Sequence, residues 1–174
     1  DLPTIRYNDG KCDPGGRLWV GSMGMEPTIN FRASLYRLDH DLKIHKMLDS
    51  ITVSNGLCWS LDKTKMYYID TPTGKVRVFD YDNETGNISN GKIAVEIPRG
   101  MGGPDGMTID SEGNLWICLW GGACVCCFDP ENGEMLRRID VPAKNVTSCA
   151  FGGKDLKTLF ITSASISMGP EDVQ

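Results

Sequence analysis

A polar residue followed by glycine recurs at the start of short apolar runs along this 174-residue chain. The aligned positions are Asp9, Asn55 and Asp105, with Ser148 as a looser fourth copy, and they are 46, 50 and 43 residues apart. Carboxylate and amide oxygens are hard ligands that suit Ca²⁺, Mg²⁺ or Mn²⁺ and that Zn²⁺ tolerates. If the fold brings these positions together, the pattern predicts a site for one divalent cation. Taken singly, Asp-Gly and Asn-Gly are usually turns, and that alternative stays open for each copy.

Each copy opens a set of strand-like segments, and such sets, repeating every ~40–50 residues, are typical of β-propeller blades. The units cover about residues 6–50, 54–97 and 104–142, with an incomplete fourth unit over 147–174. A β-sandwich would also have evenly spaced short strands, but it would not repeat one motif at nearly constant spacing. The sequence therefore predicts an all-β fold in which residues 1–174 form a single partial propeller of about three and a half blades. Because a propeller closes with roughly 4–8 blades, we expect the intact protein to be longer.

The channel of such a propeller would collect the repeated polar residues. The innermost strand of each blade lines the channel, so the starts of these strands converge near the axis. Asp9, Asn55 and Asp105 would then direct their oxygen atoms to one point, and the glycine after each would let the backbone turn sharply. Three other acidic residues fit strand-end or turn roles better: Asp70, Asp110 and Asp129.

Charge and composition exclude some classes of partner. The net charge of −5 and the pI of about 5.0 argue against nucleic acid or an anionic membrane surface. No apolar stretch has the length needed to cross a bilayer, and the N-terminal residues do not read as a signal segment.

The seven cysteines are odd in number and scattered through strand-like runs, which favours reduced thiols and a cytoplasmic location. Strand alternation would put Cys124 and Cys126 on one face and Cys127 on the other. Packing is the favoured interpretation of this cluster, with a soft-metal or redox site as the alternative.

Histidine and tryptophan add little catalytic chemistry. His40 and His45 fall in presumed outer strands, so a Ser–His triad is not expected. The tryptophans are predicted to pack between blades, although Trp120, before Gly121 and Gly122, could instead line the channel mouth.

Several sequence motifs, in the same order along the chain, resemble those of the regucalcin, senescence marker protein-30, gluconolactonase and luciferin-regenerating-enzyme-like family. They are Arg6-Tyr7-Asn8-Asp9-Gly10-Lys11, Ser54-Asn55-Gly56-Leu57, Tyr67-Tyr68-Ile69-Asp70, Phe79-Asp80-Tyr81-Asp82, Pro104-Asp105-Gly106-Met107 and Phe151-Gly152-Gly153. The resemblance implies a six-bladed propeller with one divalent cation (Ca²⁺, Zn²⁺, Mn²⁺ or Mg²⁺) in the channel. The sequence does not define an oligomeric state, and a monomer is expected for the intact protein. The resemblance also implies hydrolysis of sugar lactones of the gluconolactone or gulonolactone type. The alternative within the same resemblance is a non-enzymatic calcium-binding regulatory protein.

The same resemblance implies roles for individual residues. Asn55 and Asp105 are expected as metal ligands, with Asp105 also the general acid/base. Arg6, Asn8 and Glu26 are expected to contact the substrate, and Asp9 to bind solvent or metal. The remaining ligand of the family, a glutamate in the first blade, is expected N-terminal to residue 1. Without the resemblance, Arg6 would be read as a surface arginine and Glu26 as a solvated loop acid.

Overall fold

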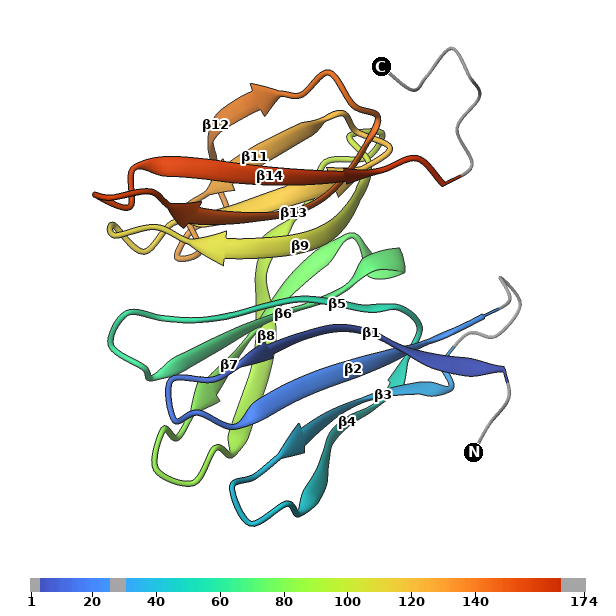
Figure 1. The fold of residues 1–174 in the computed structure, drawn as a ribbon, viewed down its shortest axis with the longest axis vertical. Coiled ribbons are helices and arrows are strands. Elements are labelled where there is room, and N and C mark those ends of the chain that lie inside the picture. Colours follow the sequence, from blue (N-terminus) through green and yellow to red (C-terminus); the bar gives the residue numbers. More distant parts are fainter. Residues whose placement is uncertain (1–3, 26–30, 167–174) are drawn as a thin grey trace.

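The computed structural model describes residues 4–25 and 31–166, which form antiparallel β-sheets arranged as a fan (Figure 1). Blade A contains β1 (Ile5–Cys12), β2 (Leu18–Gly24), β3 (Ala33–Leu38) and β4 (Ile44–Ile51). Blade B contains β5 (Ser54–Trp59), β6 (Lys65–Asp70), β7 (Lys75–Tyr81) and β8 (Ile88–Glu96), with the 3₁₀ turn η1 (Thr71–Thr73) after β6. Blade C contains β9 (Gly103–Ile109), β10 (Leu115–Trp120), β11 (Cys124–Phe128) and β12 (Met135–Asp140). Blade D contains β13 (Asn145–Gly152) and β14 (Thr158–Ala164). The predicted all-β class and four-stranded repeat are confirmed.

The first strand of each blade is its innermost strand. In sequence order β1 lies beside β5, β5 beside β9, and β9 beside β13, and Figure 1 shows β5 and β9 facing each other across adjacent blades. Blades C and D are also joined by one backbone pair, Trp120 with Asn145. This arrangement places the starts of four distant segments around one axis.

The hydrophobic core lies between blades, and strand alternation divides each sheet between two neighbours. In β6, Met66 and Tyr68 pack toward blade A, whereas Tyr67 and Ile69 pack toward blade C. All four are at most 3% exposed. Each interface therefore depends on side chains from both of its blades.

The cysteine cluster belongs to this core. Cys124 and Cys126 pack on the face of β11 toward blade B, and Cys127 packs on the face toward blade D. All three thiols are buried and free. The predicted alternation and the packing interpretation are both confirmed.

Two strands differ from the predicted pattern, since the sequence alone predicts strands over Ile93–Glu96 and Met107–Asp110. β8 begins at Ile88 rather than near Ile93, because its pairing with β7 shifts register and Asn90 takes a positive φ of 53°. That irregularity lets an Asn- and Gly-containing segment with turn-like composition join the sheet. β9 begins at Gly103, before the apolar run that the sequence suggested.

The same hydrogen-bond pattern stabilises one hairpin turn in blade A and one in blade C. Asp13 accepts hydrogen bonds from the Arg17 backbone N–H at 2.8 Å and the Trp19 indole at 3.0 Å. Asp110 accepts from the Asn114 backbone N–H and the Trp116 indole, both at 2.9 Å. The same offsets of four and six residues fix each turn to its second strand, so Asp110 has the turn role predicted for it.

Asp13 also ties blade A to blade B. Its carboxylate accepts the Tyr81 hydroxyl at 2.7 Å and pairs with Arg17 at 3.2 Å. Burial acts to raise the pKa of Asp13, but hydrogen bonds from Trp19, Arg17 and Tyr81 outweigh it and hold the pKa below its usual value. The carboxylate is therefore stabilised in its ionised form at neutral pH.

We expect Asp13→Ala to lower the free energy of unfolding by about 3 kcal/mol at pH 7, because it leaves buried donors without an acceptor. A group with a lowered folded pKa contributes stability above its unfolded pKa of about 3.9 and loses it as pH falls through the folded value. Urea unfolding at pH 7 and pH 3 measures both effects, with exposed Asp41→Ala as the control. Equal loss in the two variants at pH 7 would contradict the role assigned to Asp13.

Among the described residues, no helix has the length and apolar character needed to cross a membrane.

Candidate channel site

The repeated polar residues meet in one cavity at the start of the innermost strands. It has a volume of about 280 Å³ and is lined by Asn8, Asp9, Asn55, Asp105, Gly106, Trp120, Thr147 and Ser148. These residues come from all four blades, although they are far apart in sequence. The structure therefore brings together the aligned positions Asp9, Asn55, Asp105 and Ser148.

Every innermost strand carries a register shift at this level. The pairing shifts between Tyr7 and Gly10 in β1, between Asn55 and Leu57 in β5, and between Val146 and Ser148 in β13. β9 has the equivalent irregularity where its pairing passes from Pro104 to Met107. A β-bulge redirects side chains, and bulges are common next to functional sites. The repeat is thus a repeated bulge that turns one polar side chain of each blade toward the channel.

The glycines after the polar residues serve close packing rather than a sharp turn. Gly56 and Gly106 lack a positive φ, contrary to the expectation that they permit unusual backbone angles. A Cβ at Gly56 would lie 2.7 Å from the Asp105 carbonyl oxygen, and one at Gly106 would lie 2.7 Å from the Thr147 carbonyl oxygen. Glycine is required because each innermost strand contacts the backbone of the next.

Hydrogen bonds fix the orientation of the Asn55 side chain, which is 7% exposed. The Thr71 hydroxyl donates to the Pro104 carbonyl at 2.7 Å. Its oxygen can then only accept, and it receives the Asn55 amide N–H at 2.8 Å. The Asn55 carbonyl oxygen consequently points to the side of Asn8, whose amide donates to it at 3.1 Å.

Asn8 and Arg6 form a short polar relay on β1. The Asn8 amide also donates to the Ser54 carbonyl at 2.8 Å, which joins blades A and B. Arg6 donates to the Asn8 side-chain oxygen at 3.1 Å and to the Tyr7 carbonyl at 2.9 Å. Arg6 is exposed, is not among the cavity-lining residues, and is joined to that lining by its hydrogen bond to Asn8.

The two carboxylates interact electrostatically. Burial and the nearby Asp9 carboxylate raise the pKa of Asp105 to about 7, and the Gly106 backbone N–H opposes this only partly. Burial also raises the pKa of Asp9, against a hydrogen bond from the Gly10 N–H and the charge of Lys11. Such a pair is poised for proton transfer near neutral pH or for binding a cation.

The donor set fits a hard divalent cation. Two carboxylates and the fixed oxygen of Asn55 face one cavity, where burial and the Asp9 carboxylate raise the pKa of Asp105. Among the described residues, no three His, Cys, Asp or Glu side chains form a group that could hold a metal. The protein ligands available here are therefore two carboxylates completed by amide oxygen.

Some predicted residues fall elsewhere, and some cavity residues were not predicted. Glu26 lies outside the described residues. His40 contacts the Gly15 carbonyl and His45 pairs with Asp39, both on the exposed side of blade A. The sequence did not indicate Thr147, which lines the cavity, or Thr71, which orients Asn55 from outside it, because both stand outside the aligned positions of the repeat.

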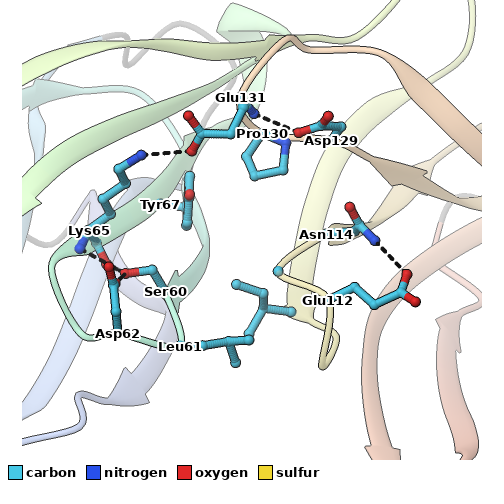
Figure 2. A pocket seen from close by; sticks show the side chains of 12 residues that line it. Ser60, Leu61, Asp62, Lys65, Tyr67, Glu112, Asn114, Asp129, Pro130 and Glu131 are labelled. Atoms are coloured by element: carbon cyan, nitrogen blue, oxygen red, sulfur yellow. Dashed lines mark hydrogen bonds and ion pairs between the residues drawn. The ribbon is translucent and has the colours of Figure 1, made fainter.

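A second hollow lies at the other ends of these strands, between the hairpin turns of blades B and C (Figure 2). Its volume is about 260 Å³, similar to that of the channel cavity. Its polar groups are engaged with one another, as Lys65 pairs with Glu131 at 2.7 Å and Asp129 accepts the Glu131 N–H at 2.8 Å. Asp129 is thus a turn residue, as predicted, and the channel end is the stronger candidate.

The fold and this cavity together define a β-propeller fragment with a polar, carboxylate-containing channel site. The chain belongs to the SMP-30/Gluconolactonase/LRE-like family, whose sequence model matches residues 1–165.

Three similar proteins show how much of the chain is matched and at what sequence identity. YvrE of Bacillus subtilis (strain 168) is 48% identical over 165 residues, covering 95% of this chain and 56% of YvrE. The structure of regucalcin from Agrobacterium tumefaciens superimposes with a TM-score of 0.91 at 32% identity, covering 98% of this chain and 57% of that one. The gluconolactonase XC5397 of Xanthomonas campestris gives a TM-score of 0.74 at 27% identity over 91% of this chain and 54% of its own.

The chain therefore spans a little over half the length of the proteins it matches. The solved relatives of this family are six-bladed propellers. Three and a half blades of six are about 58%, which agrees with the covered share of 57%. The propeller prediction is confirmed by these structures.

Proposed function

We propose that the whole protein hydrolyses sugar lactones with one divalent cation in the channel. The observation that carries the proposal is the meeting of Asp9, Asn55 and Asp105 from three blades in one cavity, with the pKa of Asp105 raised to about 7. Family membership supports it, as does XC5397, which is titled a gluconolactonase. The name of YvrE classes that relative provisionally as a sugar lactone lactonase.

Each residue has a chemical task in this proposal. Asn55 and Asp105 hold the cation, with Asp9 as a possible further channel ligand. A cation held there would supply Lewis-acid chemistry, polarising the lactone carbonyl and lowering the pKa of water. A carboxylate beside the reacting carbonyl can accept a proton from the attacking water and return it to the leaving oxygen, which is the task proposed for Asp105. Arg6, Asn8 and Glu26 supply donors and acceptors for substrate hydroxyl groups.

A second candidate is a calcium-binding regulatory protein without hydrolytic activity. It is favoured by the Agrobacterium relative, which is titled a calcium-binding protein, regucalcin. Both candidates use the same cavity, so they differ only in whether a lactone is turned over. A cytoplasmic location is proposed for either one.

The function is tested with a substrate series on the whole protein. Hydrolysis of D-glucono-1,5-lactone and L-gulono-1,4-lactone, followed by acid release, is expected to exceed hydrolysis of an open-chain sugar ester by at least about a hundredfold. Tight Ca²⁺ binding without turnover of any lactone would instead favour the regulatory protein.

We expect Thr71→Val to weaken binding of the cation by about tenfold, because the Asn55 amide then loses the acceptor that fixes its orientation. Thr71→Ser keeps the hydroxyl and is the matched control. Calorimetric titration of the whole protein with Ca²⁺ measures the difference. Equal affinity in the Val and Ser variants would show that Asn55 needs no support from Thr71.

A further inference from the structure

The channel cavity has one large apolar residue among the described residues that line it. Asn8, Asp9, Asn55, Asp105, Thr147 and Ser148 offer polar side chains, whereas Trp120 offers an aromatic ring. A sugar lactone has hydroxyl groups around its edge and C–H groups on its ring faces. The polar residues can form hydrogen bonds with the hydroxyl groups at the edge of the sugar ring. The C–H groups on the ring face need an apolar surface to pack against.

The backbone holds Trp120 firmly at the channel mouth. It is the last residue of β10, and it pairs with Gly103 of β9 on one side and with Asn145 of β13 on the other. Gly122 packs directly against the Met101 carbonyl, where a Cβ could not fit. The position of Trp120 is therefore set by three neighbouring segments.

Strand alternation also places Trp120 on the side of β10 that faces blade D. Cys118 lies on that side and packs with Val146, whereas Leu119 packs with blade B. Thr147 and Ser148 of β13 complete the cavity wall beside it.

Trp120 differs from the three other tryptophans. Trp19, Trp59 and Trp116 are 0%, 6% and 9% exposed, whereas Trp120 is only partly buried. Trp19 and Trp116 donate their indole N–H groups to Asp13 and Asp110. Among the described residues, the indole N–H groups of Trp59 and Trp120 have no partner, but Trp59 is buried in the core between blades A and B, whereas Trp120 borders the cavity. An aromatic ring with an uncommitted N–H beside a polar cavity is suited to an amphipathic ligand.

We propose that Trp120 forms the apolar wall of the sugar subsite. Its ring packs against the C–H face of the lactone ring, and its indole N–H donates to a substrate hydroxyl group. This proposal rests on the lactonase function proposed above and makes Trp120 a residue that selects for a sugar ring.

The kinetic test uses three variants of the whole protein with D-glucono-1,5-lactone. Trp120→Ala is expected to raise KM about tenfold with kcat changed by less than about threefold, because it removes binding contacts and leaves the carboxylates in place. Trp120→Phe keeps a ring face and is expected to raise KM about threefold. Trp116→Phe changes the same residue type on the same strand outside the cavity, so its KM should equal that of the wild type.

A binding test separates this proposal from the lactonase function. D-Glucono-1,5-lactam, a hydrolysis-resistant analogue, is expected to change the tryptophan fluorescence of the wild type and not that of Trp120→Phe. If the wild type hydrolyses no lactone, the proposed function fails, and the lactam titration still decides the role of Trp120. Absence of lactam binding to the wild type, or equal lactam affinity in Trp120→Ala, would overturn the proposal.

Discussion

Asp105→Asn is expected to lower kcat/KM for lactone hydrolysis by at least about a thousandfold, measured in the whole protein at saturating metal. The change removes a buried cavity carboxylate that is proposed both to hold the cation and to accept and return a proton. Asparagine has nearly the same shape, so the loss reflects proton transfer and charge rather than a change in packing.

Asp110→Asn is the matched control for this prediction. Asp110 lies only five residues further along the chain, but it accepts hydrogen bonds from Asn114 and Trp116 in a hairpin turn. That variant should lose stability and keep its kcat/KM. Wild-type turnover in Asp105→Asn would exclude the acid/base role proposed for Asp105.

Metal binding is expected to depend steeply on pH, because the cation must displace a proton from Asp105. With a pKa of about 7 in the metal-free site, Ca²⁺ should bind roughly 25-fold more weakly at pH 5.5 than at pH 7.5. At pH 6.5, binding should release about 0.8 proton. Calorimetry in two buffers of different ionisation enthalpy measures both quantities.

The raised pKa of Asp105 also makes the stability of the metal-free protein depend on pH. An acid whose folded pKa is raised destabilises the fold as pH rises from its unfolded value near 4 to about 7. Stabilisation by added Ca²⁺, followed as a shift in Tm, should therefore be larger at pH 7.5 than at pH 5.5. A shift independent of pH would place the bound cation away from Asp105.

The repeated motif of a polar residue followed by glycine made it possible to predict both the blades and the site. Because innermost strands must converge on an axis, matching positions in each blade could be placed together before their side chains were known. Asp9, Asn55 and Asp105 line the predicted channel cavity for this reason. The alternation of Cys124, Cys126 and Cys127 followed from strand geometry alone.

What the sequence did not reveal depends on contacts between blades. Thr71 follows β6 and accepts the Asn55 amide because its own hydroxyl donates a hydrogen bond to the Pro104 carbonyl of blade C. Gly56 and Gly106 were assigned to sharp turns, but their lack of a side chain is needed where the next strand passes. Such requirements cannot be read from one strand, since the partner backbone lies between 33 and 49 residues away along the chain.

The proposed metal-dependent lactonase is tested most directly by measuring lactone hydrolysis in the whole protein. The protein is stripped with a chelator, and turnover of D-glucono-1,5-lactone is measured before and after Ca²⁺, Zn²⁺, Mn²⁺ or Mg²⁺ is restored. We predict that turnover disappears on chelation and returns with at least one of these cations. Turnover that persists undiminished without metal, or that no cation restores, would contradict the proposed channel site.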